Sequence, residues 1–494
     1  MITIIVIIAT ILRVDKINTH AILFPDAAKD ILVSIEAVKR KRLPLLGIAS
    51  SVPRFKQGPV NVWIEMLIYQ LFGLNLLAFS IIYALFGILA VVALYQLTVN
   101  FVNKKTALIA SALLALSPLA VAHSRMIYHT TPIPLTLILY FWALLKLYQK
   151  KKFSLFLSVF LWTINFQFEL NLFPLILLIP YVIYKSKQKL EKKDYLRIFS
   201  ALFVGLLPQI IYDLNNGLEQ LVAFNVWVIY RIAAFFIPGE HNFSVGKFSA
   251  TFSDFWFYFQ KIFSADNFIV FILFLFLLII AIIQIIKVIK KRVQGPQEIK
   301  LNFLIELSLI TSGLLIISYL VKGYPSEAYF PPFFVLLPLI IAYGISLIQS
   351  KLKFILLTLL ALLLMINLKG IYNHNFFVSN KQNFNYGPSV HEQRQMIKQI
   401  ANLSLSIFQL ASLNEEASFD SYLDNYRLIV KEQGLKENTL YGQKFYIEEK
   451  NVERAWPEKF KNYQKIEFTN RDVYYKKQQG EEGESRSERG QPGV

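Results

Sequence analysis

The hydropathy pattern of the chain is dominated by long apolar runs. They occupy residues 76–101, 107–122, 134–148, 153–166, 170–184, 195–212, 268–289, 301–321, 329–348 and 354–368. A helix of about 20 apolar residues crosses the roughly 30 Å hydrocarbon core of a bilayer. Together with the apolar stretch at residues 1–12, the pattern predicts about eleven transmembrane helices. Because only helices and closed barrels satisfy their backbone inside lipid, we expect an all-α polytopic membrane protein.

Two long polar segments interrupt these runs, at residues 13–59 and 213–267. The second segment is rich in aromatic residues, among them Trp227, Tyr230 and Trp256, which is typical of amphipathic segments at a membrane interface. The N-terminal stretch has no positive residue before it and no small-residue cleavage site after it. It therefore predicts a first membrane helix instead of a signal peptide.

The distribution of Lys and Arg over the short loops predicts the orientation. One set of alternate loops carries basic clusters such as Lys150–Lys152 and Lys290–Arg292, whereas the opposite short loops carry only Arg125 and Lys322. The positive-inside rule places the clusters in the cytoplasm. Both long loops and the C-terminal region should then be extracytoplasmic, in a protein of the cell (inner or plasma) membrane.

We therefore expect three parts along the chain. Residues 1–368 form the transmembrane domain, with residues 13–59 as the first outer loop and residues 213–267 as the second. Residues 369–478, of mixed polar composition, form a small extracytoplasmic domain. The Gly, Glu and Ser content of residues 479–494 predicts a disordered tail.

Composition agrees with a membrane protein and excludes some chemistry. Hydrophobic residues make up 55% of the 494 positions and charged residues 17%, against about 25% in soluble domains. The net charge of +18 is explained by loops that face anionic lipid headgroups, so no nucleic-acid partner is expected. The chain has no cysteine, which rules out thiolate nucleophiles, disulfides and cysteine-ligated metals.

Candidate acidic chemistry is concentrated in the first outer loop. Asp26 and Asp30 are four residues apart, so on a helix both carboxylates project from one face. Repulsion between them favours proton uptake by one carboxylate, which suits it to act as a base. Alternatively, Pro25 and Asp26 open a helix, with Asp26 as a capping residue and Asp30 in solvent.

Outward-facing cations are the candidate binding groups for an anion. They are Arg54, Lys56, Arg125 and Lys322, although each also fits a lipid-headgroup contact at a helix end or in a basic loop. Residues Gly58 and Pro59 predict a turn that leads into a helix. His123 and His129 flank Arg125, but no third ligand lies nearby in the sequence, so we expect neither a metal nor another cofactor.

Taken together, these segments resemble the GT-C glycosyltransferase superfamily, in the branch of protein O-mannosyltransferases and lipid A aminoarabinose transferases. The resemblance spans about residues 1–350 and rests on the order of four elements. These are Leu12–Arg13 at a helix end, the acidic motif at Asp26 and Asp30, Gly58–Pro59 before a helix, and Ser124–Arg125. The family often has Asp-Glu at the acidic motif, where this chain has Asp26 followed by Ala27.

The resemblance implies a GT-C-like helix bundle that transfers a sugar, with inversion, from a polyprenyl-phosphate donor to a hydroxyl acceptor on the outer face. The acceptor can be a lipid, a glycan or a protein. Asp26 would be the catalytic base with Asp30 beside it, and Arg54, Lys56, Arg125 and Lys322 would meet the leaving phosphate. A substrate groove would include Gly58, Pro59, Tyr324 and Tyr329.

Two other classes of protein remain open from the sequence. A membrane transporter or lipid-linked glycan flippase would need charged residues inside its spans, and these are few here, with Glu306 the clearest. A non-catalytic membrane assembly protein would act through the outer C-terminal domain. Transfer of a labelled sugar from a polyprenyl-phosphate donor separates the enzyme from both.

Overall fold

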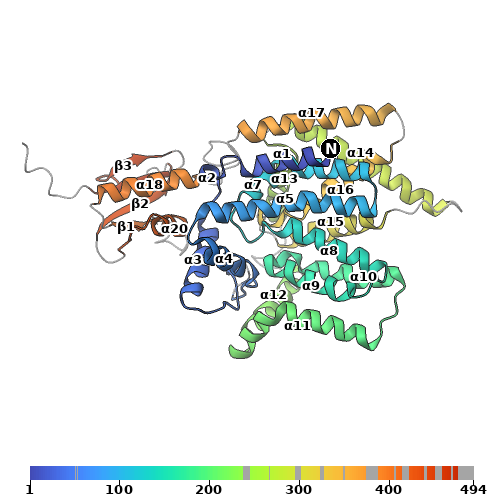
Figure 1. Ribbon diagram of the computed structural model, residues 1–494, viewed down its shortest axis with the longest axis horizontal. Coiled ribbons are helices and arrows are strands. Elements are labelled where there is room, and N and C mark those ends of the chain that lie inside the picture. The colour runs from blue at the N-terminus through green and yellow to red at the C-terminus, as the bar shows by residue number, and fades with distance from the viewer. Residues whose placement is uncertain are drawn as a thin grey trace, which may run out of the picture. The chain divides into compact units, whose positions relative to one another are not determined.

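In the computed structural model the chain divides into two compact units (Figure 1). The first unit comprises Met1–Ile22 and Asp30–Phe377, and the second comprises Leu23–Lys29 and Val378–Val494. The structure describes residues 1–50, 52, 54–236, 245–265, 267–294, 302–322, 327–348, 351–373, 388–404, 408–413, 422–438, 442–450, 459–468 and 471–476.

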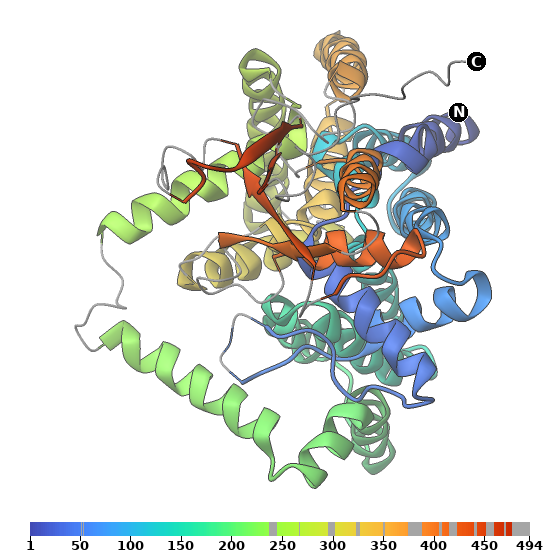
Figure 2. The same cartoon turned by 90° about the vertical axis from the view of Figure 1, so that its left-hand side faces the viewer.

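The described part of the first unit is built from helices, several of which Figure 2 shows close to end on. They are α1 (Ile2–Val14), α2 (Ile17–His20), α3 (Pro25–Lys39, which starts in the second unit), α4 (Val60–Phe72), α5 (Leu76–Phe101), α6 (Lys104–Ala115), α7 (Pro118–Ser124), α8 (Ile133–Tyr148), α9 (Ser154–Phe168), η1 (Leu170–Leu177), α10 (Leu178–Ser186), α11 (Lys192–Asn215), α12 (Glu219–Phe236), α13 (Val245–Phe263), α14 (Phe268–Gln294), α15 (Phe303–Lys322), η2 (Glu327–Tyr329), α16 (Phe333–Ser346) and α17 (Lys351–Asn373).

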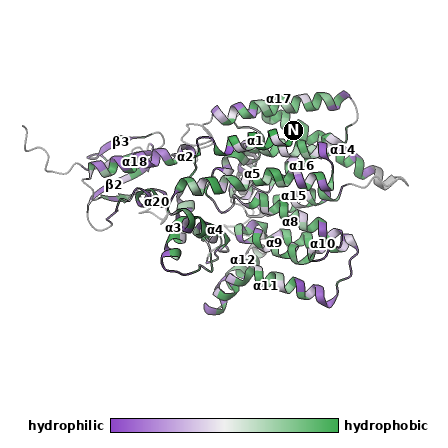
Figure 3. Ribbon diagram, viewed as in Figure 1, coloured by the Kyte–Doolittle hydropathy of each residue, from purple (hydrophilic) through white to green (hydrophobic). Residues whose placement is uncertain are grey.

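Helix α5 shows how the sequence sets these elements. Its apolar run begins after Asn75, whose side chain accepts hydrogen bonds from the amides of Leu77 and Ala78 at 3.0 and 3.3 Å. This caps two amide groups that have no partner within the helix. The helix has the bounds that the sequence predicts, and it packs against α1, α6 and α8. Figure 3 shows that α1, α5 and α8 are predominantly hydrophobic.

The predicted single span at residues 107–122 is bent. Helices α6 and α7 meet at an angle of 64°, with Pro118 at the first position of α7. Proline has no amide hydrogen, and its ring clashes with the preceding turn, so the helix cannot continue straight through it. The prediction of one continuous helix was therefore wrong at this point.

Fewer of the described helices reach the length of a full span than the sequence pattern predicts. Four described helices are long and apolar enough to cross a membrane, or five if α6 and α7 count as one bent span. Seven further apolar helical segments, among them α1, α8, α9 and α16, are shorter than a full span. The arrangement is that of a multi-pass membrane protein, and the count of eleven helices stays a prediction.

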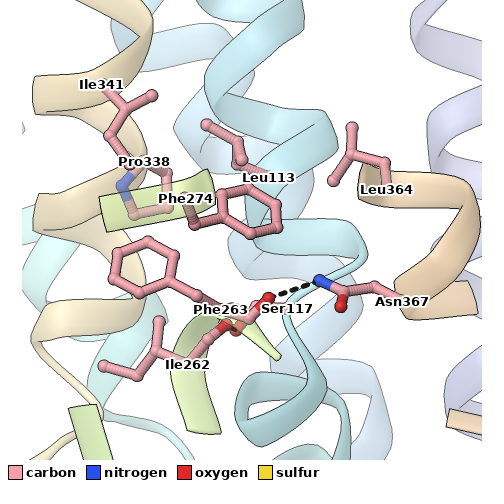
Figure 4. Close-up of a pocket in the computed structure, with 9 residues that line it drawn as sticks. All are labelled: Leu113, Ser117, Ile262, Phe263, Phe274, Pro338, Ile341, Leu364 and Asn367. Carbon is pink, nitrogen blue, oxygen red and sulfur yellow. Dashed lines mark hydrogen bonds between the residues drawn. The ribbon is translucent and has the colours of Figure 1, made fainter. Parts of the chain in front are cut away.

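The second long polar segment is largely helical in its described part, where it forms α12 and α13. The last turn of α13 is tied to its neighbours at a small apolar pocket (Figure 4). Ser117 donates a hydrogen bond to the carbonyl oxygen of Ile262, and Asn367 donates one to that of Phe263, both at 2.7 Å. These side chains satisfy carbonyl groups that have no partner inside the helix. The pocket is therefore a packing joint between α13, α17 and the bend at Ser117.

The second unit contains a mixed four-stranded sheet in the order β1-β2-β4-β3. Its strands are β1 (Phe408–Ala411), β2 (Gln443–Glu449), β3 (Gln464–Glu467) and β4 (Arg471–Tyr475). Strand β2 pairs in parallel with β1 and antiparallel with β4, which pairs antiparallel with β3. Helices α18 (Val390–Leu403) and α20 (Asp424–Glu432) pack together, and Arg394 joins them through a two-pronged ion pair with Glu432.

Candidate functional site

The segment that carries Asp26 belongs to the second unit. Helix α3 begins at Pro25, so Asp26 is the second helical residue and not the capping residue. An acidic side chain in the first turn interacts favourably with the positive end of the helix dipole. Asp26 is half-buried. Just before it, the carbonyl oxygen of Leu23 accepts a hydrogen bond from Gln393 of α18 at 2.9 Å.

Asp30 lies in a buried polar cluster of the first unit. It is 2% exposed, so the alternative of a solvated Asp30 was wrong. The side-chain amide of Asn61 donates hydrogen bonds to Asp30 Oδ2 and to Glu65 Oε1, both at 3.0 Å. The Tyr83 hydroxyl lies 2.6 Å from Asn61 Oδ1 and 3.1 Å from Glu65 Oε1. The cluster therefore joins α3, α4 and α5.

Sequence reasoning missed Asn61, Glu65 and Tyr83. A signal for two of them is present, because Asn61 and Glu65 are polar residues four apart in the otherwise apolar stretch 60–68. Such spacing places both on one face of a helix. Nothing in the sequence connects that face with Asp30 or with Tyr83, which the fold brings to it.

Arg54 and Lys56 lie on a loop whose backbone is held while the side chains stay exposed. Gln220 donates a hydrogen bond to the carbonyl oxygen of Arg54 at 3.0 Å and accepts one from the amide of Lys56 at 2.7 Å. Arg54 has a left-handed backbone (φ 63°), as a tight turn requires. Both side chains are exposed, so each can contact an anion that is dissolved in the solvent or that belongs to a lipid headgroup.

Gln220 is itself fixed by the start of α12. It is 3% exposed, and its backbone amide donates a hydrogen bond to Asp213 Oδ1 at 2.7 Å. The amide of Leu221 donates to the other carboxylate oxygen at 3.0 Å. Asp213, at the end of α11, thus satisfies free amides at the start of α12 and stabilises its dipole. This connects the cation-bearing loop to two helices that are distant in the sequence.

Gly58 and Pro59 form the junction between that loop and α4, as the sequence predicts for a turn before a helix. Both are buried, and Pro59 is the residue immediately before the helix. A Cβ on Gly58 would lie 2.3 Å from Cγ of Gln167. Gly58 is required here because the backbone approaches the α9 side chain so closely. The role of Gly58 and Pro59 in binding substrate stays a prediction.

A second polar group lies behind the same loop. Glu169 is 4% exposed and caps η1 by accepting a hydrogen bond from the backbone amide of Asn171. Gln57 donates a hydrogen bond to Glu169 Oε2 at 3.4 Å, and His129 Nε2 lies 3.8 Å from the same oxygen. The loop, α9 and the segment after α7 are therefore joined through one carboxylate.

Arg125 and Arg13 are fully buried and make hydrogen bonds to the backbone. Arg125 donates to the carbonyl oxygens of Leu12 at 3.0 Å and Asp15 at 2.9 Å. Arg13 donates to the carbonyl oxygen of Ala115 and to the hydroxyl of Ser124. The two guanidinium groups thus join the end of α1 to the ends of α6 and α7. A phosphate-binding role for Arg125 stays a prediction. In that role Arg125 would bind the phosphate while it keeps these hydrogen bonds to the backbone.

The remaining candidates lie around α15 and η2. The side chain of Lys322 and all of Tyr324 fall outside the described residues. Tyr329 is buried, and its ring packs edge-on against Tyr319 with centroids 6.0 Å apart. Next to it in η2, Glu327 Oε1 lies 3.3 Å from His123 Nδ1. Tyr329 therefore contributes to the core of this region, and a role in a substrate groove stays a prediction.

Metal ligation finds no support within the described ranges. No group of three or more His, Asp or Glu side chains there has the arrangement to hold a metal ion. His123 and His129 are each engaged with a different glutamate. The contact of His129 with Glu169 is 3.8 Å long, and its Nδ1 has no hydrogen-bond partner among the described residues.

The structure therefore brings part of the predicted site together. In the first unit, the exposed cations Arg54 and Lys56 sit on a loop fixed by Gln220 and Glu169, and the loop leads through Gly58 into the helix of the Asp30 cluster. This arrangement places exposed positive charge on a loop whose backbone is held by hydrogen bonds. Asp26 is anchored separately, through the second unit.

Comparisons with known proteins agree with the architecture. Residues 56–212 match the family described as dolichyl-phosphate-mannose-protein mannosyltransferase. None of the curated proteins matches the chain.

Among solved structures, ArnT from Cupriavidus metallidurans bound to undecaprenyl phosphate is similar over 96% of this chain and 97% of its own, with a TM-score of 0.60 and 10% identity. The oligosaccharyltransferase of Archaeoglobus fulgidus in its apo form is similar over 97% of this chain and 74% of its own, with a TM-score of 0.52 and 10% identity. The same archaeal protein, AglB, in complex with an inhibitory peptide and a dolichol phosphate gives a TM-score of 0.50 at 10% identity, with the same coverage. ArnT and AglB are both GT-C glycosyltransferases, so the resemblance seen in the sequence is confirmed, and the chain has the GT-C fold over nearly its whole length.

Proposed function

We propose that this protein is a GT-C glycosyltransferase that moves a sugar from a polyprenyl-phosphate-linked donor to a hydroxyl acceptor on the outer face of the membrane, with inversion. The observation that carries the proposal is the fold similarity, over 96% of the chain, to a structure with bound undecaprenyl phosphate. The family match at residues 56–212 supports the same donor class. That range includes Lys56, Gly58 and Arg125, but neither Asp26 nor Arg54.

The reaction requires one proton transfer and one substitution. The carboxylate of Asp26 takes the proton of the acceptor hydroxyl while the oxygen of that hydroxyl attacks the anomeric carbon of the sugar. The bond between that carbon and the phosphate oxygen breaks on the opposite face, and polyprenyl phosphate leaves with the bonding electron pair. Attack opposite to the leaving group inverts the anomeric configuration.

Negative charge grows on the phosphate as the bond breaks, so cations near it lower the barrier. Arg54 and Lys56 suit this task because their side chains are exposed and their backbone is fixed by Gln220. An exposed side chain can adjust its position to contact the phosphate. Because the backbone of the loop is already fixed, less conformational entropy is lost on binding. Lys322 and Arg125 remain further candidates from the sequence.

The test is transfer of a labelled sugar by the purified full-length chain. A panel of undecaprenyl-phosphate-linked sugars with a radiolabel in the sugar is offered together with lipid, glycan and peptide acceptors. The proposal expects label in an acceptor and release of unlabelled undecaprenyl phosphate in equal amounts, with both lost in Asp26→Asn. Movement of the intact labelled donor across a vesicle membrane, without cleavage, would instead establish the flippase alternative.

A further inference from the structure

The Asp30 cluster contains more hydrogen bonds than its amide and hydroxyl hydrogens can supply. Asn61 has two amide hydrogens, which go to Asp30 Oδ2 and to Glu65 Oε1. Tyr83 has one hydroxyl hydrogen but lies within hydrogen-bond distance of both Asn61 Oδ1 and Glu65 Oε1. The contact with Asn61 is the shorter, at 2.6 Å, and an amide oxygen can only accept. With one hydroxyl hydrogen for two acceptors, Tyr83 leaves one of its two contacts without a hydrogen unless the carboxyl group of Glu65 carries a proton.

The surroundings of Glu65 favour the neutral form as well. Glu65 is fully buried, and its Oε2 has no hydrogen-bond partner among the described residues. A buried carboxylate with an unsatisfied oxygen is far more costly than a buried carboxylic acid. Helix α4 has 13 residues and is shorter than a full membrane span. Burial first, and the nearby Asp30 second, raise the pKa of Glu65 well above its ordinary value, against the opposing hydrogen bonds from Tyr83 and Asn61.

We propose that Asp30 and Glu65 hold one proton between them, carried by Glu65, and that this protonated pair fixes α3 against α4 and α5 for catalysis. Among the residues that the structure describes, the ionisable groups whose charges act on Glu65 and Tyr83 are Asp30 on α3, Glu65 on α4 and Tyr83 on α5. Asp30 is thus assigned as the partner of Glu65, and a positioning residue, instead of the proton-sharing partner of Asp26. The catalytic part of this inference rests on the proposed function, because α3 carries Asp26 in its first turn.

The protonation state has a consequence for stability that does not depend on any activity. Above the ordinary pKa of a glutamate, the folded chain keeps a proton that the unfolded chain has lost. The folded state is therefore destabilised as the pH rises, until Glu65 also loses its proton in the folded state. Glu65→Gln keeps the shape and a hydrogen-bond donor without an ionisable group, so it should remove this part of the pH dependence.

The proton itself can be observed in the full-length protein in detergent. Infrared spectra at neutral pH should show the carbonyl stretch of a protonated carboxylic acid in the wild type, and Glu65→Gln should remove it. Asp30→Asn should keep the band but move its loss to lower pH, because the negative charge of Asp30 no longer opposes ionisation. Glu36→Gln is the matched control, since Glu36 is exposed on α3 in a pair with Arg40. A band that survives Glu65→Gln, or one whose titration ignores Asp30→Asn, would overturn the shared proton.

Turnover separates a positioning role from a merely structural one. Glu65→Gln should retain turnover within about twofold of the wild type, whereas Glu65→Leu should lower kcat by about tenfold with little change in the KM for the undecaprenyl-phosphate sugar. The thermal midpoint of each variant shows whether it is folded. Equal kcat in both folded variants would overturn the positioning role. If the wild type transfers no sugar while the infrared band and its titration behave as expected, the proposed function fails and the proton assignment stands.

Discussion

The side-chain amide of Gln393 donates a hydrogen bond to the carbonyl oxygen of Leu23, three residues before Asp26. The same amide donates to the carbonyl oxygen of Pro388, and Asn425 donates to Gln393 Oε1 at 3.1 Å. Gln393 is completely buried, so each of its polar atoms depends on these partners. The segment that leads to the candidate base is therefore anchored by the C-terminal domain. The proposed role of Asp26 therefore predicts that this domain contributes to turnover.

Replacement of Gln393 should remove the hydrogen bonds that hold the segment before Asp26. Gln393→Leu removes the partner of three groups, namely the carbonyl groups of Leu23 and Pro388 and the side-chain amide of Asn425, at a cost of about 1 to 3 kcal/mol for each that is buried. We expect a lower thermal midpoint and a fall in turnover. Gln399→Leu, an identical change at an exposed position of α18, is the control and should leave both unchanged. Equal turnover in the two variants would show that the anchor does not matter for catalysis.

The catalytic assignment of Asp26 predicts a large loss with little structural change. Asp26→Asn keeps the size of the side chain but cannot accept the acceptor proton, so turnover should fall by about 10²-fold or more. Asp26 occupies the first turn of α3 and does not cap it, so the asparagine should cost little stability beyond a small helix-dipole contribution. Turnover is measured on purified protein with donor in excess. A rate close to the wild type would remove Asp26 as the base.

The helices with long apolar runs could be predicted from the sequence, and the bends and buried polar clusters could not. Helix α5 has its predicted bounds because a long apolar run and the cap at Asn75 both specify them. The break at Pro118 was missed because hydropathy does not register a bend. The cluster of Asp30 and Glu65 was missed for another reason, since its four members come from three helices and only tertiary packing makes them neighbours.

The candidate phosphate ligands should separate into two kinds by their effect on stability. Arg54→Ala and Lys56→Ala remove exposed side chains, so they should raise the KM for the donor without a change in the thermal midpoint. Arg125→Ala leaves the carbonyl groups of Leu12 and Asp15 without a donor and creates a cavity, at a cost of roughly 2 to 5 kcal/mol. An increase in donor KM in a folded Arg125→Lys variant would show that Arg125 also meets the phosphate. Unchanged donor KM in both loop variants would exclude Arg54 and Lys56.

Orientation in the membrane can be tested cleanly because the chain has no cysteine. Single cysteines at Lys104 and Lys192, at the starts of α6 and α11, should react with a membrane-impermeant maleimide only after permeabilisation. A cysteine at Lys450, just after β2, should react in intact cells. Labelling of position 450 from the cytoplasmic side alone would reverse the predicted topology and place the proposed reaction on the inner face.

The close packing of Gly58 predicts a specific loss when a methyl group is added. The new Cβ of Gly58→Ala would lie 2.3 Å from Cγ and 2.6 Å from Cβ of Gln167. Gln167 is 3% exposed and donates a hydrogen bond to the carbonyl oxygen of Gly205, so it cannot simply swing away. Overpacking of this kind costs about 1 to 3 kcal/mol, and relief of the clash would displace the loop of Arg54 and Lys56.

We therefore expect Gly58→Ala to lower the thermal midpoint and to raise the KM for the donor together. Gly313→Ala is the matched control, because a Cβ there meets no atom within 4 Å and alanine favours the helix by up to about 1 kcal/mol. If Gly58→Ala were as stable as the control, the contact with Gln167 would be readily relieved. A Gly58→Ala variant that lost stability but kept the wild-type KM for the donor would show that the loop tolerates displacement. Arg54 and Lys56 would then not need the fixed backbone that Gln220 and Gln167 give them.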